Sequence, residues 1–383
     1  MTALPERRRK RTIAMVLTTV TVMIVGPLLG YVGVRAVLDS TAGKDATAGN
    51  LPVAEFPFTP AAALFTTDEG GVLAGITVFV LSPTGSGGSV VPITVNSDVG
   101  FDDAARRSVR SVFAEEGPEA AVFAVESLLL LSVEYSAVEG PSGLTSMLAA
   151  HEPYQVTLAS PVVAEQDADS IEAGAAVLDA ATAARVLTFG AGTVSEDARI
   201  ANAEAVWAGY AAAAGSGASP AAAATGVPVD FDDLVARVGS GPVGSRGIAH
   251  APFEAKNNPE GLDVSNLDRA DAVFVFASVA PGSMSAPNQG PIIRVEAPSG
   301  YDAQVRKTIA ILLFIQGNVV SVTTGAPPQA GTVWLVPDQA DLLRIPTDDQ
   351  IFGQVSFGEP TVRYDGVDAT LVLGTDYLES VQL

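Results

Sequence analysis

The sequence contains no cysteine. Disulfide bonds, thiolate metal sites and a cysteine nucleophile are therefore excluded. Histidine is nearly as scarce: the two histidines, His151 and His250, lie far apart in the chain and outside any H-E-x-x-H pattern. We expect no metal site, and we interpret both histidines as structural or surface residues.

Basic residues are rare outside the N-terminus. Of 21 Lys/Arg and 43 Asp/Glu residues, seven basic and two acidic ones fall in residues 1–44, so the remainder carries 14 basic against 41 acidic residues. A surface of this sign repels phosphate backbones, which argues against nucleic acid as a partner.

Charge is absent altogether from residues 12–34. A helix of these 23 residues is about 35 Å long, enough for a hydrocarbon core of roughly 30 Å. Residues 7–11 are all basic, which places this side of the span in the cytoplasm. We predict a basic cytoplasmic tail at 1–11, a transmembrane helix at 12–37 in the plasma membrane, a linker at 38–60 and an extracytoplasmic remainder.

A cleaved signal peptide is the alternative interpretation of this N-terminus. Its apolar region usually has about 7–15 residues and ends in a small-x-small site. The run here is longer, and residues 35–37 read Arg-Ala-Val. The anchor is therefore the better interpretation.

Beyond the linker, strand and helix patterns interleave, which is typical of an α/β fold. Residues 76–81 are apolar on both faces of a strand and predict a buried central strand. We expect further strands at 89–95, 131–137 and 154–160, and helices at 102–116, 119–131, 142–150, 171–187 and 196–214. A stretch rich in Ala, Gly, Ser and Pro at 211–228 ends this first domain, which we place at 61–225.

The same rhythm restarts after a connecting segment at 226–290. Within that segment we predict a helix at 231–238 and a strand at 272–279. In the final block, 291–383, we expect a helix at 302–316 and strands at 292–296, 318–323, 332–336, 361–364 and 369–373. A block of about ninety residues can form a small domain of its own.

Three segments of the first domain carry short motifs in a recognisable order. FAEEGP at 113–118 leads to VESLL at 125–129 like a helix pair, EAGAAVLDA at 172–180 is similar to G-x-x-x-L-D-G, and EDARIANA at 196–203 stands where D-x-x-R-x-x-R-Q is usual. Together they resemble the LytR–CpsA–Psr (LCP) family of cell-envelope proteins. GVDATLVLGTD at 366–376 resembles the LytR C-terminal domain that often follows, and such two-domain chains are typical of actinobacteria.

The resemblance implies an α/β sandwich with a central mixed sheet, followed by a small C-terminal α/β domain. It also implies a chemistry, since LCP enzymes are phosphotransferases that move a glycopolymer from a polyprenyl pyrophosphate carrier onto peptidoglycan. That reaction needs carboxylates for Mg²⁺ and an arginine cluster that binds the pyrophosphate bidentately and stabilises its developing charge.

The sequence departs from the family pattern at most of these positions. Gly75 stands where the first strand usually has an acid, and the I-P-R-D stretch reads I-T-V-N at 93–96. The R-x-R that follows the L-D-G motif reads T-F-G at 188–190.

The last motif keeps part of its pattern. Arg199 matches, Glu196 is a conservative replacement, and Asn202 and Ala203 replace Arg and Gln. Each lost oxyanion donor removes about 2.7–4 kcal/mol of transition-state stabilisation, so we expect a non-catalytic relative, degenerate in its catalytic motifs. Glu196 and Arg199 are the candidate remnants of a catalytic site; alternatively they form an i, i+3 ion pair on the surface.

Arg106, Arg110 and Arg199 are the candidate ligand-binding residues. Arg106 and Arg110 would share a face of the helix at 102–116. The alternative is a solvated helix face balanced by neighbouring acids, namely Asp102, Asp103 and Glu115. No cofactor is expected, and Mg²⁺ is needed only if the domain is an active transferase.

Three functions follow from these observations. The first is a membrane-anchored envelope protein whose LCP-like domain binds a polyprenyl-linked lipid, a glycopolymer or an envelope protein. The second is an active LCP phosphotransferase with a rearranged site. The third is a scaffold that acts through its C-terminal domain.

Overall fold

The computed structural model describes residues 51–100, 106–163, 170–217, 226–338 and 349–382, together with Tyr31, Arg35, Leu342 and Ile345. Contacts divide the chain into a unit of Met1–Val53 with Thr361–Arg363 and a larger unit of Ala54–Pro360 with Tyr364–Leu383. The predicted span at 12–37 lies outside the described residues except for Tyr31 and Arg35, which are helical. Among the described helices, none is both long and apolar enough to cross a membrane.

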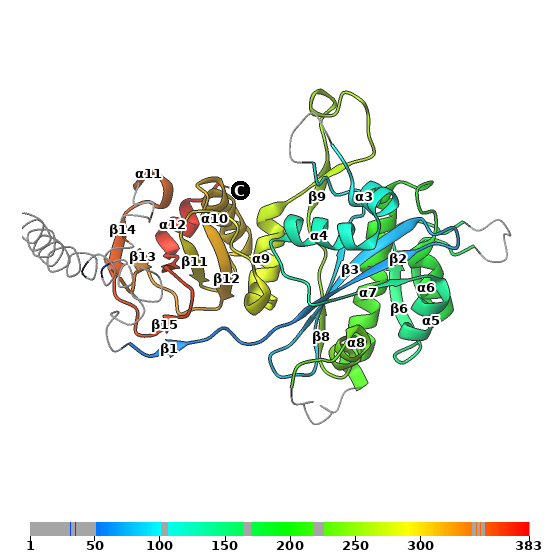
Figure 1. The fold of residues 1–383 in the computed structure, drawn as a ribbon, viewed down its shortest axis with the longest axis horizontal. Coiled ribbons are helices and arrows are strands. Elements are labelled where there is room, and N and C mark those ends of the chain that lie inside the picture. Colours follow the sequence, from blue (N-terminus) through cyan, green and yellow to red (C-terminus); the bar gives the residue numbers. More distant parts are fainter. Residues whose placement is uncertain are drawn as a thin grey trace, which may run out of the picture. The chain divides into compact units, whose positions relative to one another are not determined.

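A five-stranded mixed sheet forms the centre of the first domain (Figure 1). Its order is β5 (Tyr135–Glu139), β2 (Ala61–Thr67), β3 (Leu73–Leu81), β4 (Gly88–Ile93) and β8 (Val243–Ser245). β3 pairs antiparallel with β2 and β4, whereas β5 and β8 are parallel to their neighbours. The central mixed sheet and the buried strand at 76–81 are confirmed.

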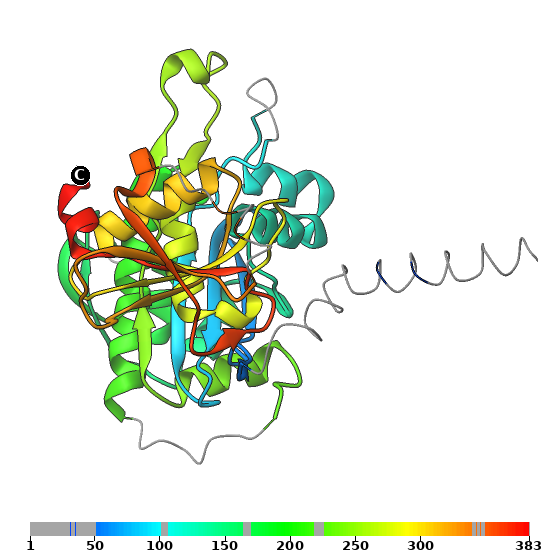
Figure 2. The ribbon, with the colours of Figure 1, turned by 90° about the vertical axis from the view of Figure 1, so that its left-hand side faces the viewer.

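Helices cover both faces of this sheet because its central strands are apolar on both sides (Figures 1 and 2). In β2, Ala61, Ala63 and Phe65 belong to one core, and Ala62 and Leu64 to the other. The first core contains side chains of α3 (Val109–Glu116), α4 (Pro118–Leu129) and α9 (Arg269–Val279). The second contains side chains of α5 (Pro141–Leu148), α6 (Ala180–Thr188), α7 (Glu196–Gly217) and α8 (Phe231–Gly239).

A separate two-stranded sheet packs against α7. It consists of β6 (Tyr154–Leu158) and β7 (Gly174–Leu178), which are antiparallel. The prediction of one helix over 171–187 is therefore wrong in its first half. Asp179 accepts a hydrogen bond from the Thr182 N–H and so caps α6, which ends the strand and starts the helix.

Two other elements differ from the sequence prediction, one in its start and one in its type. Ser108 caps α3, so that helix begins at Val109 instead of residue 102, and residues 101–105 lie outside the described part. The strand predicted at 272–279 is the helix α9, whose N-terminus is capped by Asp268. Every residue from Ala270 to Ala277 in α9 is buried, so the apolar run lacks the polar face by which an amphipathic helix is recognised.

The final block forms a second five-stranded sheet within the larger unit. Its order is β12 (Asn318–Thr324), β11 (Ile292–Ala297), β16 (Ala369–Val372), β13 (Thr332–Leu335) and β14 (Val355–Gly358). The helices are α10 (Asp302–Phe314), α11 (Asp349–Phe352) and α12 (Thr375–Ser380), and the short elements of the chain are β1 (Val53–Ala54), β9 (His250–Pro252), β10 (Ser265–Leu267) and β15 (Arg363–Tyr364). The predicted strand–helix–strand order at 292–323 is confirmed.

Asp271 of α9 ties the first domain to this block. It is 3% exposed and accepts hydrogen bonds from Arg246 Nη2 at 3.2 Å, Arg306 Nη1 of α10 at 3.1 Å and the Ala249 N–H at 2.8 Å. Both guanidinium groups also lie over the ring of Phe274. The Asp271 carboxylate thus accepts hydrogen bonds from three different segments of the chain.

Asp271→Asn should destabilise the protein, because it removes the charged acceptor of three donors and preserves the side-chain shape. We expect the free energy of unfolding to fall by about 1–3 kcal/mol. Chemical denaturation of the full-length chain measures this. Glu260→Gln, at an exposed position, is the control, and equal unfolding midpoints for the two variants would refute the assignment.

Candidate functional site

The carboxylate of Glu196, in the first turn of α7, accepts hydrogen bonds from four donors. Its Oε2 accepts from Arg199 Nη1 at 2.8 Å and from Arg110 Nη2 at 3.0 Å. Its Oε1 accepts from the Val95 N–H at 3.1 Å and from the Thr94 hydroxyl at 3.3 Å. Glu196 and Arg199 are 8% and 7% exposed, so this cluster is buried.

The remaining donors of the two arginines are also engaged. Arg199 donates through Nε to the Phe189 carbonyl at 2.8 Å and through Nη2 to the Ala74 carbonyl. Arg110 donates through Nε to the Leu73 carbonyl at 3.1 Å. The guanidinium groups are thus held by α7, α3 and the start of β3 as parts of the fold.

Burial lowers the pKa of the Arg199 guanidinium below its ordinary value, and Arg110 adds to this effect. Glu196 acts in the opposite direction by stabilising the charged form. Glu196 lies between the two guanidinium groups, and the exposed Asp263 lies 3.7 Å from Arg110 Nη1, so two carboxylates balance the two cations.

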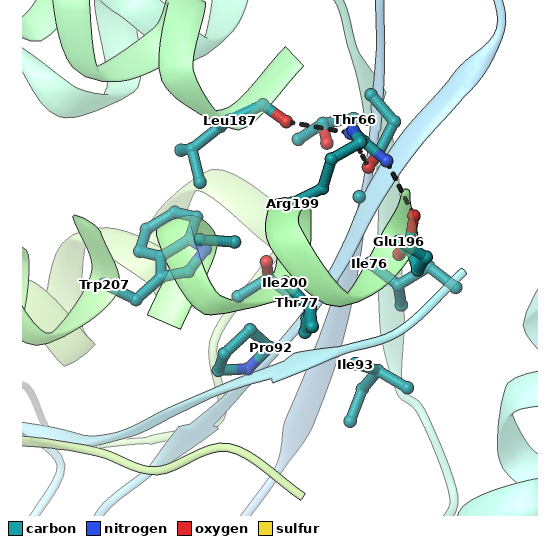
Figure 3. A pocket seen from close by; sticks show the side chains of 13 residues that line it. Thr66, Ile76, Thr77, Pro92, Ile93, Leu187, Glu196, Arg199, Ile200 and Trp207 are labelled. Carbon is teal, nitrogen blue, oxygen red and sulfur yellow. Dashed lines mark hydrogen bonds and ion pairs between the residues drawn. The ribbon is translucent and has the colours of Figure 1, made fainter. Parts of the chain in front are cut away.

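The cavity beside this cluster is small. Its volume is about 10 Å³, enough for a single water molecule. Strand residues such as Thr66, Thr77 and Pro92 form one wall, and Ile200 and Trp207 of α7 close the other (Figure 3). Trp207 is 1% exposed and packs edge-on against Phe79 of β3, so its ring leaves little free space on this side of the cavity.

The structure brings together two of the three predicted ligand-binding arginines. Arg110 and Arg199 meet at Glu196, although they belong to different helices. The interpretation of Arg199 and Glu196 as a surface ion pair is wrong, because both are buried. The sequence signal for this site was the i, i+3 spacing of Glu196 and Arg199 in the motif at 196–203.

Arg106 lies elsewhere. It precedes α3 instead of sharing a helix face with Arg110, and its Nη1 donates to Asp98 at 2.6 Å. Its guanidinium lies 3.6 Å from the centre of the Phe253 ring. Sequence reasoning missed Asp98 as the partner, because the nearby acids at 102 and 103 were expected to balance this charge.

The donor set does not fit a magnesium ion. In the described part of the chain, no group of three or more His, Asp or Glu side chains is arranged to hold a metal. Glu196 is the one carboxylate of the buried cluster, and two guanidinium groups and two further donors already engage it.

Comparison with known proteins gives likenesses in structure alone. No family model and no curated protein matches the chain. Bacillus subtilis TagV is 12% identical over 67% of this chain and 98% of its own, with a TM-score of 0.42. TagT bound to LIIa-WTA is 15% identical over 57% of this chain and 88% of its own, with a TM-score of 0.40.

The protein Lin1025 of Listeria innocua is also similar. It is 18% identical over 57% of this chain and 96% of its own, with a TM-score of 0.35. Because each of these TM-scores is below 0.5, the likenesses transfer neither family membership nor chemistry to this chain.

Glu196→Ala should strongly destabilise the protein, because it leaves two buried guanidinium groups without their anion. We expect a loss of about 3–5 kcal/mol in the free energy of unfolding. Added phosphate should restore part of that loss in the variant and have no such effect on the wild type, as measured by thermal unfolding of the full-length chain.

Asp197→Ala is the matched control for this experiment. Asp197 is adjacent in sequence, its side chain is 75% exposed, and it contacts His250 instead of the cluster. Similar losses for the two alanine variants would contradict the role assigned to Glu196.

His151 makes the stability depend on pH. It packs edge-on against Tyr210, and burial lowers its pKa below the ordinary value of about 6.5. The unfolded chain therefore binds the proton at a higher pH than the folded chain. The free energy of unfolding is highest above about pH 6.5, and it falls as the pH drops through and below that value. His151→Gln should reduce the stability difference between about pH 7.5 and 5.5, and His250→Gln should leave the His151 contribution in place; an unchanged pH profile in His151→Gln refutes the assignment.

Proposed function

We propose that this chain is a membrane-anchored, extracytoplasmic cell-envelope protein whose LCP-like domain acts by binding and does not transfer phosphoryl groups. The observation that carries the proposal is the Glu196 carboxylate, which occupies the position between Arg110 and Arg199 that an anionic substrate would need. A pyrophosphate can bind there only by displacing a buried internal anion.

The closed cavity supports the same proposal. A volume of about 10 Å³ excludes a polyprenyl chain from this place, since ligand pockets have roughly 300–1,000 Å³. A polyprenyl-linked lipid would therefore need another place, such as the groove of about 490 Å³ beside α3 and α4 that Val112, Phe123 and Leu128 line among other residues. A glycopolymer or an envelope protein would be bound by the outer surface of the domain.

The location in the envelope rests on the sequence. The basic residues 7–11 and the uncharged run at 12–34 support a single-pass anchor in the plasma membrane with the N-terminus in the cytoplasm. The motifs at 172–180, 196–203 and 366–376 support an LCP-like domain and a LytR C-terminal-like domain of actinobacterial type.

An active transferase is the second candidate. The convergence of Arg110 and Arg199 favours it, because a displaced Glu196 side chain would leave both guanidinium groups facing one point. A scaffold acting through the block at 291–383 is the third candidate, favoured by the buried attachment of α9 to that block at Asp271.

The full-length chain, incubated with Mg²⁺ and a polyprenyl pyrophosphate-linked saccharide, should release no product above background. An active LCP transferase, which releases product in the same assay, is the positive control. We also expect no loss in Arg199→Lys, because there is no activity to lose. Magnesium-dependent release by the wild type that falls at least about tenfold in Arg199→Lys would overturn the proposal in favour of the transferase.

A further inference from the structure

The stretch at 54–60, which leads from β1 to β2, is fixed to the larger unit where it begins. The Asp365 N–H donates a hydrogen bond to the Ala54 carbonyl at 2.9 Å. The ring of Phe56 stacks on the ring of Tyr364, with 5.4 Å between the centroids and 24° between the planes. The beginning of this stretch therefore packs against the final block of the chain.

The same stretch is also fixed where it ends. Thr59 is 1% exposed, and its carbonyl accepts a hydrogen bond from the Ser283 hydroxyl at 2.8 Å. The Thr59 hydroxyl accepts another from the Gly282 N–H at 3.1 Å. Prolines at 57 and 60 restrict the backbone further, because a proline ring fixes its own φ and limits the residue before it. The stretch therefore holds its side chains in defined positions.

The side chain of Phe58 lies between these two attachments and is 53% exposed. It belongs to neither hydrophobic core. Pro57 beside it is exposed and Phe56 is half-buried, so three consecutive residues without a polar side-chain atom contribute to one surface. Contiguous apolar groups that stay exposed are the kind of surface by which a folded domain contacts a protein or a membrane.

The position of this stretch in the chain favours a membrane as the occupant. The predicted span ends at residue 37, and the sixteen residues 38–53 separate it from Ala54. Sixteen residues reach at most about 58 Å in any conformation, so an inserted span keeps Ala54 within that distance of the bilayer. Among the described residues of the larger unit, those at 54–60 are the nearest to the span along the chain.

We propose that the stretch at 54–60 lies on the outer surface of the membrane that holds the span, with the ring of Phe58 in the interfacial zone. Phenylalanine side chains are favoured in that zone, where an apolar face is buried by roughly 5–10 Å. The inference deepens the proposed function and rests on it, because it takes the predicted anchor as inserted. It adds which surface of the folded part meets the bilayer.

The charge of the chain determines the kind of contact. The part beyond the span is strongly acidic and is repelled by anionic headgroups, so the attraction comes from apolar burial. A weak attraction suffices, because the span and the stretch belong to one chain and their effective concentration is high. Glu55 is exposed and is the one charged residue at 54–60, so its carboxylate limits how deeply the stretch enters.

Tryptophan fluorescence of the full-length chain tests this contact. The two native tryptophans, Trp207 and Trp334, are 1% and 0% exposed, and the wild-type chain measures their background. Phe58→Trp is reconstituted into phosphatidylcholine vesicles whose acyl chains carry bromine close to the headgroup, where bromine quenches nearby indole rings. We expect the added fluorescence to be quenched at least about threefold more than in Phe314→Trp. Phe314 is 88% exposed on α10 and is the matched control.

Flotation of each variant with the vesicles, after a carbonate wash, separates this inference from the proposed function. A chain that floats, but whose Phe58→Trp fluorescence is quenched no more than that of Phe314→Trp, refutes the contact and leaves the anchor in place. A protein partner that covered the stretch would give the same result. A chain that does not float refutes the anchor and, with it, the contact that rests on it.

A second substitution tests the depth of the contact. Glu55→Gln in the Phe58→Trp background should increase the quenching by about a further 1.5-fold, because a neutral amide enters the interface at a lower cost than a carboxylate. Glu260→Gln changes the net charge by the same amount at another exposed position and should leave the quenching unchanged. Equal increases in the two variants would show an effect of total charge and would contradict the contact at 54–60.

Discussion

The ion pairs of Glu196 with Arg110 and Arg199 are the interactions on which the packing of the first domain depends. A buried guanidinium group needs an anion and acceptors for its N–H groups, and two such cations here share one carboxylate. The same carboxylate accepts hydrogen bonds from Thr94 and Val95 beyond the end of β4. It therefore fixes the positions of α3 and α7 at one end of the central sheet, and the chemistry available at this end follows from that structural role.

The rest of the domain is consistent with a closed site. Trp207 and Tyr210 of α7 lie in contact, and together with Phe79 they fill the second core. Aromatic side chains of this size contribute large buried areas and exclude water. These side chains leave only the small cavity of about 10 Å³ beside the Glu196 cluster.

The sequence predicts those parts of the fold whose signal is local. Residues 76–81 are apolar on both faces and form a central strand, and the order of patterns at 292–323 gives the strand, helix and strand found there. The failures have two physical causes. The run at 272–277 is buried on all sides, and in such a run the helical and strand periods cannot be distinguished. At 174–178, pairing with β6 overrides the helix preference of alanine.

The candidate site was predicted in part for a related reason. Glu196 and Arg199 lie one turn apart, so their pairing follows from the helix alone. Arg110 is 86 residues from Glu196, and only the folded sheet brings the two together. The closure of the cavity depends on side chains from several elements, which no local pattern specifies. The LytR C-terminal resemblance of residues 291–383 stays a prediction.

The burial of α9 has a consequence for how the protein can be divided. Its side chains contribute to a core that also contains residues of β11, β12 and α10. A chain that stopped before Ile292 would leave the apolar side of this helix facing water. The carboxylate of Asp271 would also lose its hydrogen bond from Arg306. The last ninety or so residues thus complete the hydrophobic interior of the part that precedes them, so we expect the two to fold stably only as one chain.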